Sequence, residues 1–243
     1  MKLGIALGGG GARGFSHIGV LKSLARAGIQ FDVVTGTSIG ALVGALYANN
    51  KLTQLEEQSK RIRFFDVPLL LSPTVSLSGM FSGRRAMELL AEFVDVETIE
   101  DLPVPYAAVA CDLYSGEIVS FTSGSLQQAV RASIAIPGVF TPVRSGRRLL
   151  IDGGTLEPVP VQAARALGAD IVVAIDLFGN RSARPDHAAK PSDGDTQRVD
   201  APHEVFTNVA TVVDYLRSLP KRLSLRDLRD SASEQVGAPN VLE

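Results

Sequence analysis

The chain has 243 residues, of which 45% are hydrophobic and 21% are charged, and its formal net charge is -2. This composition excludes a mainly disordered chain. The weakly acidic net charge differs from that of proteins that coat nucleic acids, so we expect no nucleic-acid partner. Cys111 is the only cysteine, which excludes an internal disulfide, and no group of Cys and His has the spacing of a zinc site.

The N-terminal sequence has no pattern of a secretory signal. It enters a strand-like apolar stretch within a few residues, without a continuous apolar core and a small-residue cleavage site. The uncharged stretch at residues 33–50 contains glycine, threonine and asparagine, so it is a poor membrane span. We therefore expect a cytoplasmic protein.

Two units of strand, glycine turn and helix begin the chain. Residues 2–7 predict a strand, and residues 15–27 predict a helix that ends at Gly28. Residues 32–35 predict a second strand, followed by a second helix up to about residue 50. Strands that alternate with crossover helices predict an α/β fold with a parallel sheet.

The middle of the chain predicts shorter elements. Helices are expected at 52–65, 84–93, 126–133 and 161–167, and strands at 106–111, 118–122, 149–151 and 171–176. Residues 67–83 are rich in Pro, Ser and Gly, which predicts a loop.

The last part of the chain changes in composition. Residues 179–202 contain a single large apolar side chain, Val199, so we expect a mobile polar loop. A helix is predicted over 205–219, and residues 231–243 predict a frayed tail. We expect one domain over residues 1–243.

The strongest chemical signal is a G-x-S-x-G motif formed by Gly36, Ser38 and Gly40. Between a strand and a helix, this spacing places the serine on a sharp turn with its hydroxyl exposed, and the flanking glycines avoid a clash there. The pattern therefore predicts a nucleophile. Under the alternative interpretation, the glycine and serine residues only cap the following helix. Gly40, Gly44 and Ala48 are then small simply because this helix packs closely.

The second signal is the glycine loop that follows the first strand and comprises Gly9, Gly10, Gly11, Arg13 and Gly14. Such a loop could bind a dinucleotide pyrophosphate or supply N–H groups to an oxyanion. The dinucleotide interpretation needs an acidic residue at the end of the second strand, whereas Asp32 lies at its start. Since Ser38 follows that strand end, acyl transfer is favoured.

A serine nucleophile needs a base. His187 and His203 lie in or beside the polar loop, and His17 lies on the first helix, where a packing role is the simpler interpretation. A Ser-Asp-His order is formally available through His187 or His203. Asp152 is the better candidate because it ends a strand before Gly153 and Gly154, although Asp-Gly is also a common turn signal. An ordinary aspartate, with a pKa of about 3.9, is a weak base, and burial would raise that pKa.

These motifs together resemble the three signature motifs of the patatin-like phospholipases. The three are residues 9–14, residues 36–40 and Asp152-Gly153-Gly154, and residues 131–140 resemble the bacterial branch related to the catalytic domain of neuropathy target esterase. The resemblance extends over about residues 2–178. It implies a three-layer α/β/α fold with a mainly parallel central sheet.

The resemblance also implies a function. Ser38 would be the nucleophile and Asp152 the base of a Ser-Asp dyad without a catalytic histidine, and the N–H groups around Gly10 and Gly11 would form the oxyanion hole. Arg13 would steady the glycine loop or meet an anionic headgroup. The implied reaction is hydrolysis of fatty-acyl esters of phospholipids, lysophospholipids or neutral lipids, without a metal or cofactor.

Two segments suggest contact with a membrane surface. Residues 64–71 form an apolar run, for which core packing is the simpler interpretation, and residues 215–229 are basic and leucine-rich. Transient contact at the inner face of the membrane would follow. The resemblance also predicts a further strand and helix after about residue 219, which the short polar tail does not supply. That departure keeps a non-catalytic regulatory or lipid-binding protein as the alternative, followed by a dinucleotide-binding protein.

Overall fold

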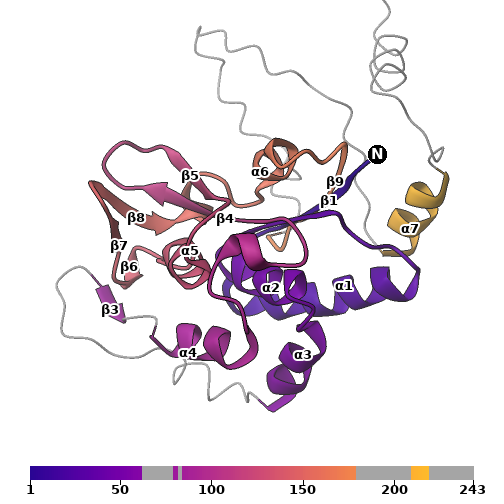
Figure 1. The fold of residues 1–243 in the computed structure, drawn as a ribbon, viewed down its shortest axis with the longest axis horizontal. Coiled ribbons are helices and arrows are strands. Elements are labelled where there is room, and N and C mark those ends of the chain that lie inside the picture. The colour runs from indigo at the N-terminus through magenta and orange to yellow at the C-terminus, as the bar shows by residue number, and fades with distance from the viewer. Residues whose placement is uncertain (62–78, 82–83, 179–208, 219–243) are drawn as a thin grey trace, which may run out of the picture. The chain divides into compact units, whose positions relative to one another are not determined.

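The computed structural model describes the chain except for residues 62–78, 82–83, 179–208 and 219–243, which are drawn in grey in Figure 1. The chain divides into two units, Lys2–Leu177 and a second unit whose described residues are Met1, Phe178 and 209–218. The expected mobile loop at 179–202, the frayed tail at 231–243 and the apolar run at 64–71 lie outside the described residues. So does most of the basic segment at 215–229.

The first unit is built on a mixed sheet of seven strands, ordered β7-β8-β4-β2-β1-β9 with β5 on β4. One half is parallel and consists of β9 (Ile171–Ile175), β1 (Leu3–Leu7), β2 (Val33–Thr37) and β4 (Tyr106–Asp112). The other half is antiparallel and consists of β5 (Ile118–Phe121), β8 (Arg148–Asp152) and β7 (Val143–Ser145).

Strands β2 and β8 lie end to end along one edge of β4. Strand β5 pairs with residues 108–111 of β4, so it occupies the other edge. Parallel β2 pairs with residues 106–109 and antiparallel β8 with residues 110–112, and the two therefore run toward each other. Their ends, Thr37 and Asp152, meet at the carboxyl edge of the parallel strands, where ligands bind in open α/β sheets.

Helices cover both faces of this sheet. Val33 packs against Ala164 of α6 (Val161–Ala166), whereas Val34, which points the other way, faces Gly44 of α2 (Ile39–Ala48). Helices α1 (Ser16–Arg26) and α5 (Leu126–Ser133) lie with α2 below the sheet in Figure 1, and α6 lies above it. The predicted three-layer α/β/α fold is therefore confirmed.

Most predicted elements are confirmed with small shifts at their ends. Helix α3 is Leu52–Arg61 and α4 is Arg84–Phe93. The expected loop at 67–83 is wrong at β3 (Gly79–Phe81), because this segment pairs with β6 (Gly138–Phe140), a strand that the sequence did not predict either. Three-residue strands carry too little periodicity to be seen.

The second unit contains the described helix α7 (Val209–Ser218), which confirms the helix predicted at 205–219 over these residues. Across the described parts of both units, no helix is long and apolar enough to cross a bilayer.

Candidate active site

Ser38 occupies the sharp turn between β2 and α2. Its backbone has φ 57° and ψ −126°, a conformation that residues other than glycine rarely adopt and that costs about 1–3 kcal/mol. A Cβ at Gly36 would lie 2.3 Å from the Gly40 carbonyl oxygen, and one at Gly40 would lie 2.1 Å from that of Leu7. Both neighbours are backbone, so only glycine fits at either position.

The structure brings Ser38 and Asp152 together, although 114 residues separate them in the sequence. The Ser38 hydroxyl donates a hydrogen bond of 2.5 Å to Asp152 Oδ2, and the Gly154 N–H donates one of 2.7 Å to Oδ1. Both side chains are nearly buried, with 6% of Ser38 and 5% of Asp152 exposed. A carboxylate that is held in this way is placed to take the hydroxyl proton.

Burial also adjusts the basicity of Asp152. Loss of solvation raises the pKa of its carboxyl group above the ordinary value, and the hydrogen bonds from Ser38 and Gly154 oppose the rise. The net shift is upward. A carboxylate with a raised pKa is a better proton acceptor than an exposed aspartate, which removes part of the difficulty noted from the sequence.

One turn of chain holds the main chain of both residues. Ser133, at the end of α5, accepts a hydrogen bond of 2.8 Å from the Ser38 N–H and donates one of 2.6 Å to the Val109 carbonyl. Two residues later, the Ala135 carbonyl accepts a hydrogen bond of 2.9 Å from the Asp152 N–H. The turn Ser133–Ala135 therefore ties the end of β2 to the end of β8.

The glycine loop lies directly beside Ser38. A Cβ added at Gly9 would lie 3.4 Å from the Ser38 Cβ, and one at Gly14 would lie 2.1 Å from Ile39, the residue after Ser38. Within the described part of the chain, neither the Gly10 N–H nor the Gly11 N–H donates a hydrogen bond. These two donors are available to a ligand at this edge of the sheet.

Arg13 and Gly8 fix the two ends of this loop. Arg13 donates its backbone N–H to the Gly10 carbonyl at 3.2 Å, and its guanidinium donates to the Leu177 carbonyl at 3.3 Å. The Gly8 N–H donates to the Ile175 carbonyl of β9 at 3.0 Å. The Arg13 side chain therefore links the loop to Leu177, which follows β9.

His17 is fully buried under the same loop. Its Nε2 lies 2.8 Å from the Gly8 carbonyl oxygen, and since a carbonyl only accepts, this nitrogen carries the proton. Burial lowers the pKa of His17, with a smaller opposing effect of that hydrogen bond. His187 and His203 lie outside the described residues, so the Ser-Asp-His order is not tested.

Asp32 does not reach the edge where Ser38 lies. Its carboxylate accepts the Leu3 N–H at 2.7 Å, at the amino end of β1 and β2. A ribose bound at the glycine loop would lie at the opposite end of these strands, so Asp32 gives the dinucleotide interpretation no support. Among the described residues, no group of three or more His, Cys, Asp and Glu could hold a metal ion.

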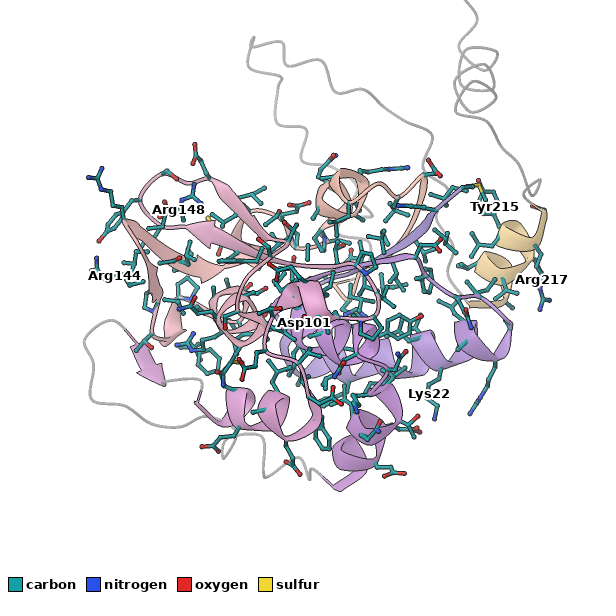
Figure 2. All side chains as sticks on the ribbon, viewed as in Figure 1. Lys22, Asp101, Arg144, Arg148, Tyr215 and Arg217 are labelled. Atoms are coloured by element: carbon teal, nitrogen blue, oxygen red, sulfur yellow. The ribbon has the colours of Figure 1, made fainter. Side chains whose placement is uncertain are left out.

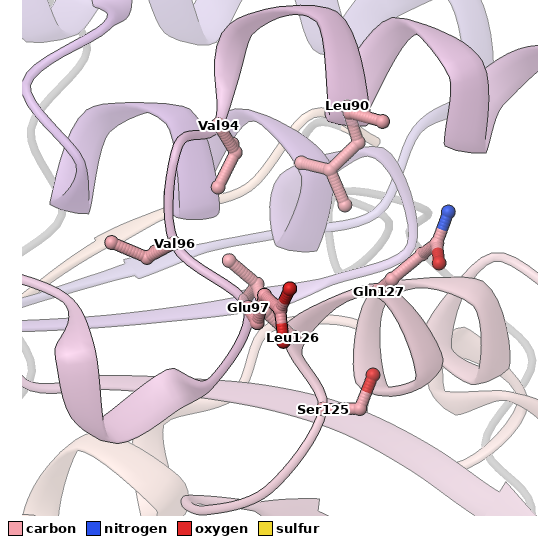
Figure 3. Close-up of a pocket in the computed structure, with 8 residues that line it drawn as sticks. Leu90, Val94, Val96, Glu97, Ser125, Leu126 and Gln127 are labelled. Atoms are coloured by element: carbon pink, nitrogen blue, oxygen red, sulfur yellow. The ribbon is translucent and has the colours of Figure 1, made fainter.

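A separate cavity of about 320 Å³ lies between the end of α4 and the start of α5 (Figure 3). Leu90, Val94, Val96 and Leu126 supply apolar walls, and Glu97 and Gln127 supply polar ones. Ser38 and Asp152 do not line it, because they lie at the other end of α5. The cavity is therefore not part of the Ser38 site.

Two buried hydrogen-bonding residues of the site belong to no sequence motif that singles them out. Ser133 falls within the predicted helix at 126–133 and within residues 131–140, and His17 is predicted only to pack on the first helix. A buried serine that follows an amphipathic helix has no distinctive spacing, so its role becomes visible only when β2 and β8 meet. Cys111 is buried in β4.

Comparison with known proteins shows the family to which most of the chain is related. Residues 5–165 match the family model described as patatin-like phospholipase. An uncharacterised NTE family protein of Mycobacterium tuberculosis is 39% identical over 191 residues, covering 79% of this chain and 53% of that protein. Human patatin-like phospholipase domain-containing protein 6 is 38% identical over 181 residues, covering 72% of this chain and 13% of that protein.

The chain spans about half the length of the mycobacterial relatives that it matches. Among solved structures, VipD from Legionella pneumophila has a TM-score of 0.38 and 16% identity over 63% of this chain and 46% of that chain, a likeness too weak to support an argument. The family match covers most of Lys2–Leu177, the unit that carries the site. The chain therefore belongs to the patatin-like phospholipase family.

Proposed function

We propose that this chain is a serine acyl hydrolase that cleaves fatty-acyl esters of phospholipids or lysophospholipids through Ser38 and Asp152. The observation that carries the proposal is the 2.5 Å hydrogen bond from the Ser38 hydroxyl to a buried carboxylate with a raised pKa. Family membership supports action on lipid acyl esters.

In the first half of the reaction, the Ser38 oxygen attacks the ester carbonyl carbon while its proton passes to Asp152 Oδ2. The carbonyl oxygen becomes an oxyanion, and the Gly10 and Gly11 N–H groups are proposed to donate hydrogen bonds to it. The positive end of the α2 dipole lies at Ser38 and favours the same charge. The carbon–oxygen bond to the alcohol then breaks, and the alcohol leaves with the proton from Asp152.

In the second half, water attacks the acyl-enzyme. Asp152 takes a proton from this water, a second tetrahedral intermediate forms, and the bond to the Ser38 oxygen breaks as that oxygen regains the proton. The products are a fatty acid and an alcohol, and both residues return to their starting states. Asp152 acts as base and acid in turn without a histidine.

Ester hydrolysis by purified Ser38→Ala tests this proposal. We expect the variant to keep its fold and to lose nearly all turnover of a soluble p-nitrophenyl ester, because the attacking oxygen is absent. Gly19→Ala serves as the control, since this exposed helix position has open space around it and should leave turnover unchanged. Equal turnover by wild type and Ser38→Ala would overturn the proposal.

A further inference from the structure

Exposed large hydrophobic side chains are unevenly distributed in the unit Lys2–Leu177. Its described residues include five, namely Leu113, Tyr114, Ile118, Ile136 and Leu156. Three of them lie on the β4–β5 hairpin, and the other two follow Ala135 and the Asp152-Gly153-Gly154 turn. All five thus lie in segments around the carboxyl edge where Ser38 and Asp152 meet. Clustered exposed apolar groups mark an interaction surface.

The neighbouring β7–β8 hairpin supplies positive charge beside these apolar groups. Arg144, Arg147 and Arg148 are all exposed, and Gly146 makes the turn between the strands with φ 57°. Figure 2 shows Arg144 and Arg148 at this end of the molecule. None of the three forms an ion pair with another described residue. On the facing hairpin the one exposed carboxylate is that of Glu117.

The two hairpin tips are fastened to each other. The Leu113 N–H donates a hydrogen bond of 2.8 Å to the Leu149 carbonyl. The buried Asp112 carboxylate accepts hydrogen bonds from the N–H groups of both Tyr114, at 3.2 Å, and Leu149, at 3.3 Å. The apolar and the basic side chains therefore belong to one rigid support, which we call the hairpin-tip surface: Leu113, Tyr114, Ile118, Arg144, Arg147 and Arg148.

The hairpin-tip surface lies beyond the Ser38 site in the direction of the carboxyl ends of the parallel strands. Strand β8 runs from the tip toward Asp152, and Leu149 precedes Asp152 by three residues, which corresponds to about 10 Å of strand. A flat partner that touches both tips would therefore face the edge that carries Ser38.

We propose that the hairpin-tip surface docks this chain on an anionic phospholipid bilayer, an inference that rests on the proposed function. Tyrosine and leucine enter the interfacial region of a bilayer, and arginine binds lipid phosphates. The tips carry three exposed arginines beside one exposed carboxylate on a chain with a net charge of -2, so positive charge is locally in excess where an anionic bilayer would bind. Docking there presents the Ser38 edge to its substrate.

Vesicle co-sedimentation of the full chain tests the proposal. The protein carries Ser38→Ala so that it cannot consume the lipid, and the probes are phosphatidylcholine vesicles with and without phosphatidylserine. We expect binding only with phosphatidylserine, and binding that weakens with salt. Arg147→Ser with Arg148→Ser should weaken binding roughly 25-fold, since each arginine near an anionic surface contributes about fivefold. Leu113→Ser with Tyr114→Ser should weaken it about tenfold or more.

The matched control removes two positive charges from the opposite edge of the sheet. Lys2 precedes β1 and Arg26 ends α1, and both are exposed, so Lys2→Ser with Arg26→Ser should leave vesicle binding unchanged. Equal weakening by the control and the tip variants would overturn the proposal. A tip variant that loses self-association in light scattering while its vesicle binding stays intact would also overturn the proposal. The hairpin-tip surface would then bind a second copy of the chain.

Turnover of a soluble ester distinguishes a failure of the docking proposal from a failure of the proposed hydrolase function. With Ser38 restored, the tip variants should hydrolyse a soluble p-nitrophenyl ester at the wild-type rate, because no tip residue contacts Ser38 or Asp152. Normal turnover with unchanged vesicle binding would overturn the docking surface alone. Absent turnover in every protein, with vesicle binding intact, would overturn the hydrolase proposal alone.

Discussion

The backbone N–H of Ser38 donates its hydrogen bond to the hydroxyl of Ser133, at 2.8 Å, and not to another backbone group. The same hydroxyl donates to the Val109 carbonyl at 2.6 Å, in the gap where β2 and β8 meet. Ser133 is fully buried, so water does not compete with its hydroxyl for these two hydrogen bonds. This side chain therefore sets the backbone conformation from which Ser38 presents its hydroxyl to Asp152.

Ser133→Ala should accordingly act as the loss of a positioning residue. It leaves two buried backbone groups without a partner, which costs roughly 1–3 kcal/mol in the free energy of unfolding. We expect kcat to fall while KM changes little, because substrate does not bind Ser133. Steady-state kinetics with a soluble ester and urea unfolding measure the two effects.

The control for Ser133→Ala is Ser125→Ala at the start of the same helix. Ser125 caps α5 by accepting the Gln128 N–H at 3.3 Å, so its loss should cost about 1 kcal/mol of stability. Its kcat should remain that of wild type. If both variants lose kcat in proportion to their loss of stability, Ser133 has no positioning role.

Asp152→Asn should lower kcat roughly 10²–10⁴-fold, the range for a lost general base. In wild type, the rate should rise with pH through a pKa above the ordinary carboxyl range, since burial raises the pKa of Asp152 and only the ionised form accepts a proton. A pH–rate profile of the variant should lack this rise. An unchanged profile in Asp152→Asn would assign the base to another group.

The same shift predicts how stability depends on pH. The pKa of Asp152 is higher in the folded than in the unfolded state, so folding favours the protonated form, and stability falls as pH rises through the interval between the two values. Above that interval the ionised group lowers stability by a constant amount. Asp152→Asn should remove this loss, so at neutral pH the variant should resist urea better than wild type. Lower stability of the variant at neutral pH would contradict this.

His17 gives the opposite dependence. Its folded pKa lies below the ordinary value of 6.5, so the unfolded state binds the proton more tightly, and stability is lost as pH falls below about 6.5. His17→Gln keeps an N–H donor for the Gly8 carbonyl and should remove this loss while retaining activity. His17→Leu should cost roughly 1–3 kcal/mol, because the carbonyl is left unpaired.

Urea unfolding at neutral and acidic pH, beside ester turnover, separates these outcomes for His17. Equal turnover by the glutamine and leucine variants would show that the hydrogen bond to Gly8 does not hold the glycine loop for catalysis. It would leave His17 with a packing role alone.

Gly40→Ala and Gly19→Ala form a second matched pair. A Cβ at Gly40 would lie 2.1 Å from the Leu7 carbonyl oxygen and 2.7 Å from the Gly8 carbonyl oxygen. Both oxygens belong to the main chain at the end of β1, so they could move away only if β1 and α2 separated. We expect this variant to misfold or to lose activity. Gly19 lies in α1 with open space around it, so alanine there should add about 0.5–1 kcal/mol of stability. Thermal unfolding measures both, and a stable, active Gly40→Ala would contradict the tight turn.

Much of the fold could be predicted because its local patterns are strong. Helix periodicity located α4 and α5 at Arg84–Phe93 and Leu126–Ser133, the bounds that the structure has. The strand that precedes Ser38 was predicted to end at residue 35, but β2 continues to Thr37, since pairing with β4 extends to Val109. Pairing with a distant strand is not visible in local sequence.

The motifs of the candidate site could be predicted from the sequence, but the residues that hold those motifs in place could not. Glycine turns have a spacing, so Ser38, Asp152 and the loop around Gly10 could be identified as candidates. The approach of Asp152 depends on β8 running antiparallel against β4, which no local pattern indicates. Ser133 and His17 act through single buried hydrogen bonds, and such bonds leave no periodicity in the sequence.

The central claim is that the Ser38 hydroxyl is an activated nucleophile. Labelling the full chain with a fluorophosphonate probe, and locating the adduct by mass spectrometry, tests it most directly. We expect one adduct on Ser38, strongly slowed labelling in Asp152→Asn and none in Ser38→Ala. A folded wild-type chain that stays unlabelled, or that is labelled at another residue, would contradict it.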